Sequence, residues 1–86
     1  MARRRKYVVL SIRPSEVSEL LLIQVNGDRR EVKEDLSLLE LIVILNLRSE
    51  QIAIELNQTV VRRSQWQAIV LHEADKVEIV HFVGGG

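Results

Sequence analysis

The residues that decide the fold are LLIQVNGDRREVKEDLSLLELIVILNL, at positions 21–47. Within them, a β-branched run at 22–25 is followed by Asn26-Gly27 and by a second extended run at 30–33. The tightest hairpin turns need positive φ at both central residues, and Asn and Gly tolerate this best. The pair therefore predicts an antiparallel hairpin.

Ser37 marks the start of a helix that we expect to cover residues 38–47. Serine is a favoured N-cap, and Glu40, three positions later, completes a capping box. The segment is apolar almost all round and rich in β-branched residues, so periodicity alone does not separate helix from strand. The capping box and the length favour a helix. A helix that is apolar on more than one side needs deep cover or a partner.

Short extended runs follow this helix. The residues at 52–56 and 59–61 predict two strands, and a single-turn helix around Trp66 leads to a last strand at 76–83. The order hairpin, helix and three strands predicts an α+β fold, with a mixed sheet of four to five strands packed on one main helix. The expected core residues are Ile23, Val25, Val32, Leu38, Leu41, Ile42, Leu45, Ile52, Ile54, Leu56, Ile69, Val77 and Ile79.

Residues 1–20 differ from the rest of the 86-residue chain. They hold a basic cluster at 3–6 and the only proline, and they predict a flexible basic extension before one domain at 21–86. The basic cluster leaves open a nucleic-acid-binding module, although a solvated tail is the commoner origin of such clusters. No apolar run reaches the roughly 18–20 residues that span a bilayer, and we expect a cytoplasmic protein with no membrane partner.

The composition excludes several chemistries. The chain has no cysteine, which excludes a disulfide, a thiol nucleophile and a cysteine-ligated zinc site. Twelve basic and twelve acidic residues balance to a formal charge of zero, so the chain as a whole gives no argument for binding nucleic acid. His72 and His81 lack the spacing of a metal site, and we expect neither a metal site nor a bound cofactor. We expect Trp66 to pack in the core or at its rim.

Gly84, Gly85 and Gly86 follow the last predicted strand directly. Glycine has no Cβ, so such a tail is thin enough to enter a narrow active site of another protein. The reactive group there is the α-carboxylate of Gly86. Attack on ATP would convert it into an acyl-adenylate, and a sulfur nucleophile would then give a thiocarboxylate. From the tail alone, a cloning scar or a frayed end is an equally good explanation.

The sequence VEIVHFVGGG at 77–86 resembles the C-terminus of the ThiS family, the sulfur carriers of thiamine biosynthesis. Other matches follow in family order, with VNG at 25–27, IELN at 54–57, VRRSQW at 61–66 and LHEADKV at 71–77. The resemblance covers residues 21–86 and implies a ubiquitin-like β-grasp fold. Two positions depart from the family pattern, because Arg62 stands where proline is usual and Ala74 where glycine is usual.

The resemblance also implies that the chain is a protein cosubstrate and not an enzyme. A ubiquitin-activating-like (ThiF-like) adenylyltransferase would adenylate Gly86, using ATP and magnesium. A sulfurtransferase would supply the sulfur, and a ThiG-like thiazole synthase would receive it. The molybdopterin-synthase small subunit, another carrier ending in Gly-Gly, stays a second candidate. The prolines usual before its glycines are absent from residues 81–83.

Four residues outside the tail are candidate contacts for these partners. Successive strand residues alternate between the two faces of a sheet, so Val80 and Phe82 face outward if Val77 faces the helix. Two exposed apolar side chains beside the tail would suit a docking patch. Arg62 and Arg63 predict a solvated edge that could pair with acidic residues of a partner.

Overall fold

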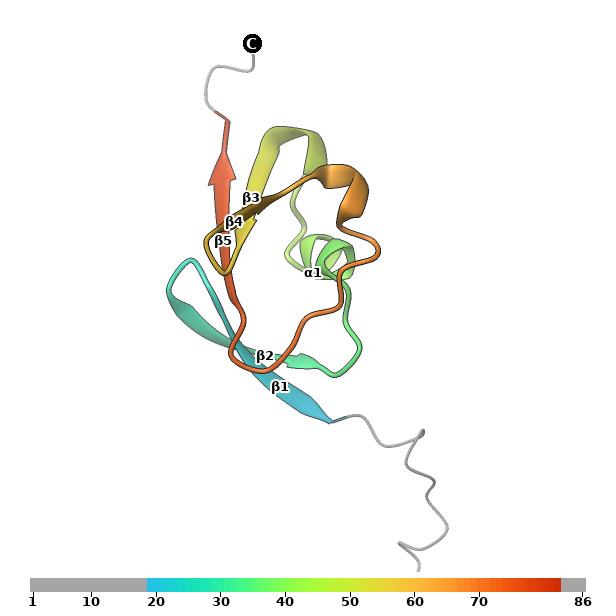
Figure 1. Ribbon diagram of the computed structural model, residues 1–86, viewed down its shortest axis with the longest axis vertical. Coiled ribbons are helices and arrows are strands. Elements are labelled where there is room, and N and C mark those ends of the chain that lie inside the picture. The colour runs from blue at the N-terminus through green and yellow to red at the C-terminus, as the bar shows by residue number, and fades with distance from the viewer. Residues whose placement is uncertain (1–18, 83–86) are drawn as a thin grey trace, which may run out of the picture.

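The computed structural model of the protein describes residues 19–82 (Figure 1). These residues form five strands, one α-helix and two short 3-10 helices. In chain order they are β1 (Leu20–Val25), β2 (Asp28–Lys33), α1 (Leu38–Ile44), η3 (Ser49–Gln51), β3 (Ile52–Leu56), β4 (Thr59–Val61), η4 (Arg63–Gln65) and β5 (Lys76–His81). The predicted order of hairpin, helix and three strands is confirmed, whereas η3 was not predicted.

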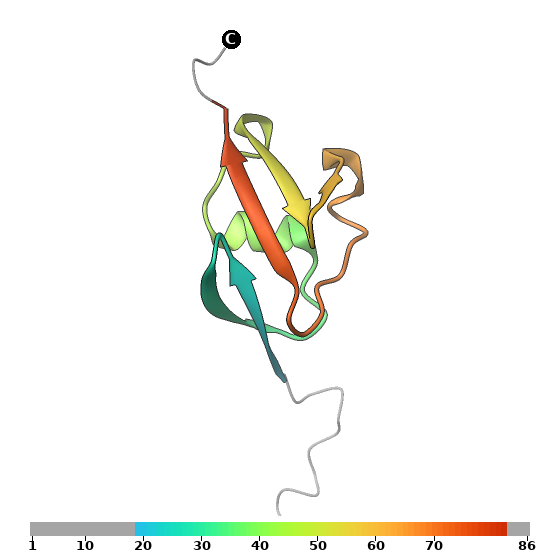
Figure 2. The same cartoon turned by 60° about the vertical axis from the view of Figure 1, so that its left-hand side comes forward.

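All five strands belong to one mixed sheet with the order β2-β1-β5-β3-β4. The central strand β5 pairs in parallel with β1 and antiparallel with β3. Helix α1 lies across one face of the sheet, behind β5 in the view of Figure 2. The α+β class and the packing of a mixed sheet on one helix are therefore confirmed. Within residues 19–82, no helix is long and apolar enough to cross a membrane.

The first hairpin has the two-residue turn that its sequence predicts. Asn26 and Gly27 both have positive φ, 49° and 87°, and Val25 pairs with Asp28 across the turn. This is the backbone that suits the twist of the flanking strands. Because so short a turn leaves Asp28 already paired, β2 begins two residues before the predicted run at 30–33.

Helix α1 begins where the capping box predicts. The Glu40 amide donates to the Ser37 hydroxyl at 3.0 Å, and the Ser37 amide donates to the Glu40 carboxylate at 2.9 Å. The next free amides, of Leu38 and Leu39, donate to the carbonyls of Ile69 and Trp66. The loop before β5 therefore supplies the acceptors that the first turn of a helix otherwise lacks.

The helix ends three residues before the predicted position 47. Asn46 has a left-handed φ of 59°, its amide donates to Val43, and the Leu47 amide donates back to Ile42. These two bonds define a Schellman motif, in which asparagine replaces the more usual glycine. The left-handed Asn46 ends the helix, although the apolar run in the sequence continues to Leu47.

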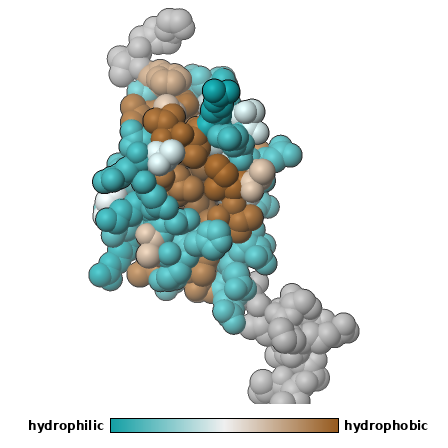
Figure 3. Space-filling model, viewed as in Figure 1, coloured by the Kyte–Doolittle hydropathy of each residue, from teal (hydrophilic) through white to brown (hydrophobic). Residues whose placement is uncertain are grey.

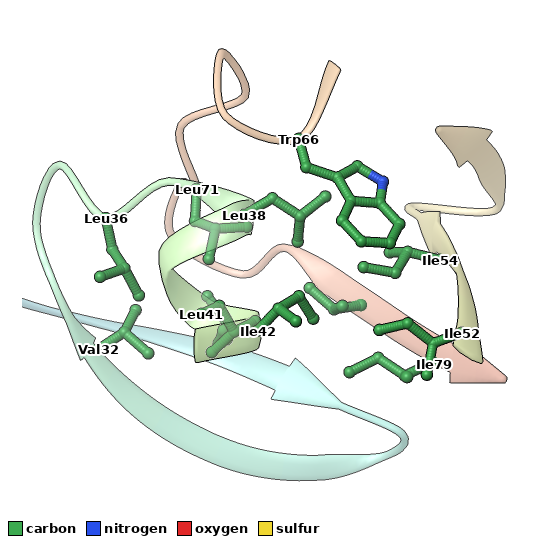
Figure 4. Close-up of a cluster of buried hydrophobic side chains, with 12 residues drawn as sticks. Val32, Leu36, Leu38, Leu41, Ile42, Ile52, Ile54, Trp66, Leu71 and Ile79 are labelled. Carbon is green, nitrogen blue, oxygen red and sulfur yellow. The ribbon is translucent and has the colours of Figure 1, made fainter. Parts of the chain in front are cut away.

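The hydrophobic core lies between α1 and the sheet, and Figure 4 shows its side chains converging from both layers. Nine of the predicted core residues are buried, whereas Val25, Leu45, Leu56 and Ile69 are only half-buried. Three further residues are buried, namely Leu36, Trp66 and Leu71; Trp66 was expected in the core or at its rim, whereas Leu36 and Leu71 were not predicted. They come from the segments that flank α1 and cross over its first turn, so their burial depends on contacts between distant parts of the sequence.

Candidate functional site

The candidate site is the end of β5, where the central strand of the sheet leads toward the glycine tail. β5 pairs with β3 from Val77 to His81, and the Phe82 amide then donates to the carbonyl of Gln51 at 2.9 Å. The strand is thus held along its length up to Phe82. Val83, which the prediction placed in this strand, lies outside the described residues.

Two asparagines from hairpin turns hold β5 from opposite sides. Asn26 accepts a hydrogen bond from the Ile79 amide at 2.6 Å and donates to the Ile79 carbonyl at 3.2 Å. Asn57 accepts from the Lys76 amide at 2.9 Å. Each side chain therefore acts as a strand partner beyond the point where its own strand stops. The sequence predicted a turn at Asn26, but it did not predict that either asparagine binds β5.

The exposed face of β5 carries the predicted apolar pair. Val77 and Ile79 are buried against the helix, whereas Val80 is 55% exposed and Phe82 59% exposed. The prediction that these two side chains face away from the helix is confirmed. Their role in docking stays a prediction.

Ala53 of the neighbouring strand β3 is paired with Val80 and extends this apolar surface. Val60 of β4 is 68% exposed, but it is paired with Glu55, which is paired with Glu78 of β5. In Figure 3, hydrophobic side chains form a continuous area from near the end of β5 into the middle of the face viewed in Figure 1, bordered by hydrophilic residues. Exposed apolar surface of this kind often marks an interaction site.

Arg62 and Arg63 are exposed, and η4, to which Arg62 leads and Arg63 belongs, lies at the same end of the molecule as the end of β5 (Figures 1 and 2). Arg62 precedes η4 and Arg63 begins it, and the Arg62 amide donates to the side chain of Gln65 at 3.1 Å. The loop is fixed by Trp66, which is 1% exposed and donates from its indole to the Val61 carbonyl at 3.2 Å. The expected burial of Trp66 is confirmed, and its packing holds the two arginines in place.

A second charged pair, absent from the sequence-based candidates, lies at this end. Arg48 forms a 3.3 Å salt bridge with Glu50 of η3. The pKa of Glu50 is lowered below its ordinary value by its own backbone amide, by Arg48 and by the charge of Arg63. Arg63 therefore lies near Glu50, although the two are 13 positions apart in sequence. No local signal could have grouped them.

The remaining candidate residues divide between the two ends of β5 and the undescribed ends of the chain. His72 precedes the turn before β5 and His81 ends the strand, so the two histidines are far apart. Residues 19–82 contain no group of three or more possible metal ligands. Gly84, Gly85 and Gly86, and the basic cluster at 3–6, lie outside the described residues.

A five-stranded mixed sheet packed on one helix, with an exposed apolar pair at the end of its central strand, defines a small ubiquitin-like β-grasp protein. The crystal structure of the thiamine biosynthesis protein ThiS from Geobacter metallireducens has this fold. It superposes with a TM-score of 0.68 at 33% identity, over 77% of this chain and 100% of that one. Residues 23–86 match the model of the ThiS family, and the chain belongs to this family.

Two curated relatives extend this comparison. The sulfur carrier protein ThiS of Bacillus subtilis is 30% identical over 66 residues, which are 76% of this chain and all of that protein. A thiazole synthase of Magnetococcus marinus is 39% identical over 64 residues, 74% of this chain. The match covers 20% of that synthase, so the chain spans only about a fifth of the length of this relative.

Proposed function

We propose that this protein is a sulfur carrier of thiamine biosynthesis, which carries sulfur as a thiocarboxylate on Gly86. Membership of the ThiS family supports the pathway and favours it over the molybdopterin-synthase alternative. The single observation that carries the proposal is the position of the tail. In the sequence, Gly84–Gly86 begin two positions after Phe82, whose amide is the last among residues 19–82 that is bonded to the rest of the domain, and the side chains of Val80 and Phe82 are exposed just before them.

The chemistry takes place on the main-chain carboxylate. A carboxylate oxygen of Gly86 attacks the α-phosphate of ATP, and pyrophosphate leaves with the electrons of the broken P–O bond. A hydrosulfide equivalent from a sulfurtransferase then attacks the acyl carbon, AMP leaves, and loss of a proton gives the thiocarboxylate. ATP and magnesium belong to the adenylyltransferase and not to the carrier.

This chain contributes a tail that is narrow enough to enter the active site of a partner enzyme. Side chains at positions 84–86 would widen a segment that must enter the nucleotide pocket of another protein, whereas glycine adds no Cβ. The carrier supplies no acid, base or nucleophilic side chain to the reaction. It is thus a cosubstrate of a ThiF-like adenylyltransferase and of thiazole synthase.

The exposed surface formed by Val80 and Phe82 is the proposed docking patch for these enzymes. Both enzymes must take hold of the same tail, so both must cover the same end of β5. The match to part of the Magnetococcus marinus thiazole synthase supports a carrier domain working close to such an enzyme. Truncation of an apolar anchor at the centre of such a patch costs a tenfold or greater loss of binding.

The proposal is tested by ATP–pyrophosphate exchange with a ThiF-like adenylyltransferase from the same organism. The wild-type chain should support exchange, and a variant with one alanine added after Gly86 should not. The variant Phe82→Ala should keep its maximal rate but need about tenfold more carrier for half-maximal exchange. Unchanged exchange by the extended variant would show that the reacting group is not the carboxylate of Gly86.

A further inference from the structure

Three arginines lie at the end of the molecule from which the tail departs. They are Arg48 before η3, Arg62 before η4 and Arg63 at the start of η4, and we name them the tail-end arginines. We infer that they form an electrostatic rim that binds acidic side chains around the tail-binding channel of the partner enzymes. This inference rests on the proposed function, and it predicts that the partner surface around the channel is acidic.

The fold brings these residues together by two separate routes. On one side, the Phe82 amide is bonded to Gln51, the last residue of η3, and the Gln51 amide is bonded to Arg48, so Arg48 lies one 3-10 turn away from the residue that contacts Phe82. On the other side, β4 runs antiparallel to β3, and Val61 is paired with Ile54. From Val61 the chain continues through Arg62 and Arg63 toward Ile52, the first residue of β3, which is paired with His81, the last residue of β5. Figures 1 and 2 show η3, η4 and the end of β5 at this one end.

The charge of this cluster is not balanced locally. Arg48 is 71% exposed and is bonded to Glu50, and this is the one salt bridge among residues 19–82. Arg62 and Arg63 are both exposed. The segments 48–51 and 62–66 hold three arginines and one carboxylate, that of Glu50. The outward residues Glu55 and Glu78 are paired with each other further back along β3 and β5. Positive groups therefore outnumber carboxylates at this end, in a chain whose formal net charge is zero. Exposed arginines of this kind raise the association rate with an acidic surface.

Distance favours acidic side chains of the partner over the phosphates of ATP as the ligand. Four residues, 83–86, separate Phe82 from the carboxylate, and a fully extended chain of four residues reaches at most about 14 Å. When this segment is extended, ATP meets its far end at more than the roughly 10 Å Debye length of 0.1 M salt, so salt largely screens the arginines from the phosphates. The protein surface around the mouth of the channel meets the base of the tail, where the arginines lie.

An apolar patch with a charged rim is also the usual composition of a protein interface. The exposed Val80 and Phe82 would form the centre, and the tail-end arginines would form part of the border. Rim charges mainly set the association rate and its dependence on salt. The predicted partner surface is therefore an apolar depression bordered by aspartate and glutamate at the side that receives the tail.

The test is charge reversal with a matched control. The variant Arg62→Glu/Arg63→Glu should raise the carrier concentration for half-maximal ATP–pyrophosphate exchange about tenfold at low salt and leave the maximal rate unchanged. The variant Arg62→Lys/Arg63→Lys keeps both positive charges, and its carrier concentration for half-maximal exchange should stay close to that of wild type. The control, Arg29→Glu/Arg30→Glu, reverses the same amount of charge on β2, at the opposite edge of the sheet, and should stay within twofold of wild type.

The difference between the reversed variant and wild type in carrier concentration for half-maximal exchange should become smaller as added salt screens the charges. Equal concentration dependence of the reversed variant and wild type at low salt overturns the inference, as does an equal loss in the control. Salt-dependent RNA binding that disappears in the reversed variant, with exchange unaffected, would overturn it in favour of a nucleic-acid surface.

Absence of exchange with wild type would instead contradict the proposed function. Thermal unfolding should show that both variants remain folded, since the cap of η4 uses the side chain of Gln65.

Discussion

At the scale of single residues, the asparagine of the first hairpin has two roles that no other residue type combines well. Its left-handed φ of 49° allows the two-residue turn, and its side chain makes two hydrogen bonds to Ile79. Glycine would keep the turn but lose both bonds. The position therefore couples the first hairpin to the strand that carries the tail.

We predict that Asn26→Gly lowers the free energy of unfolding by about 1–3 kcal/mol, because two partly buried hydrogen bonds are lost. Urea unfolding measures this change. The matched control is Asn46→Gly, at another left-handed asparagine that ends α1, where glycine is well accepted and the change should be a few tenths of a kcal/mol. Equal losses in the two variants would mean that the bonds to Ile79 do not stabilise the fold.

The turn before β5 contains a residue in an unfavourable conformation. Ala74 has a φ of 72°, and its amide is bonded to the carbonyl of Leu22 at 2.8 Å. The departure from the usual glycine of the family thus leaves the turn in place at a cost in strain. Left-handed backbone costs a residue with a Cβ roughly 1–2 kcal/mol.

We predict that Ala74→Gly raises the free energy of unfolding by about 0.5–1 kcal/mol, since relief of strain exceeds the added freedom of the unfolded chain. Ala68→Gly provides the control, because Ala68 is exposed in a turn and has no positive φ. There, glycine should destabilise the protein slightly. A loss of stability in Ala74→Gly would contradict the assignment of strain to this residue.

At the scale of elements, α1 is a short helix that depends on its ends. Its seven residues give less than two full turns of regular hydrogen bonding, so caps weigh heavily in its stability. The capping box closes one end, and the Schellman motif at Asn46 closes the other. The loop at 66–71 then covers the first turn.

We predict that Ser37→Ala lowers the free energy of unfolding by about 1 kcal/mol at neutral pH. The capping box also gives a dependence on pH. The backbone of Ser37, the Ser37 hydroxyl and the charge of Lys33 hold the pKa of Glu40 below its ordinary value of 4.5. A lowered pKa in the folded state stabilises the protein above pH 4.5, and this contribution is lost as the pH falls through the folded pKa.

The variant Glu40→Gln should therefore show a weaker loss of stability on acidification than wild type, as measured by urea unfolding at a series of pH values. Glutamine can still accept the hydrogen bond from the Ser37 amide, so the comparison isolates the charge. Parallel curves for the two proteins would mean that ionised Glu40 does not contribute to the cap.

The elements that the sequence predicts correctly are those with local signals. Asn26-Gly27 predicted the first turn, Ser37 and Glu40 the start of α1, and alternation the outward direction of Val80. The end of α1 was placed too late because the apolar run hid the signal of Asn46. The burial of Trp66 beside η4 was expected only in general terms, since its pocket is built by segments distant in sequence.

At the scale of the whole molecule, the sheet order explains how the tail is presented. β5 lies between β1 and β3: β1 pairs with its first two residues and the Asn26 side chain bonds Ile79, whereas β3 pairs with β5 as far as His81. Pulling on the tail would thus act against the whole sheet. The candidate site followed from the sequence only in part, because the glycines and the apolar pair are local, whereas the grouping of Arg48 with Arg63 exists only in the folded chain.

The sheet leaves one face for partners. Helix α1 covers the other face, so the exposed surface beside the end of β5 is open to an approaching enzyme (Figures 2 and 3). A carrier needs this arrangement, because its partners must hold the folded domain while the tail reaches the nucleotide. The glycine tail, the apolar pair and the tail-end arginines would then act in one docking event.

The most direct test of the central claim is the intact mass of the protein after incubation with a ThiF-like adenylyltransferase, a sulfurtransferase system and ATP. The wild-type chain should gain about 16 Da, the difference between sulfur and oxygen, and the gain should map to Gly86. A variant that lacks Gly86 should gain nothing. If the Bacillus subtilis ThiS gains this mass in the same mixture and the wild-type chain does not, Gly86 is not the sulfur-carrying group and the account is contradicted.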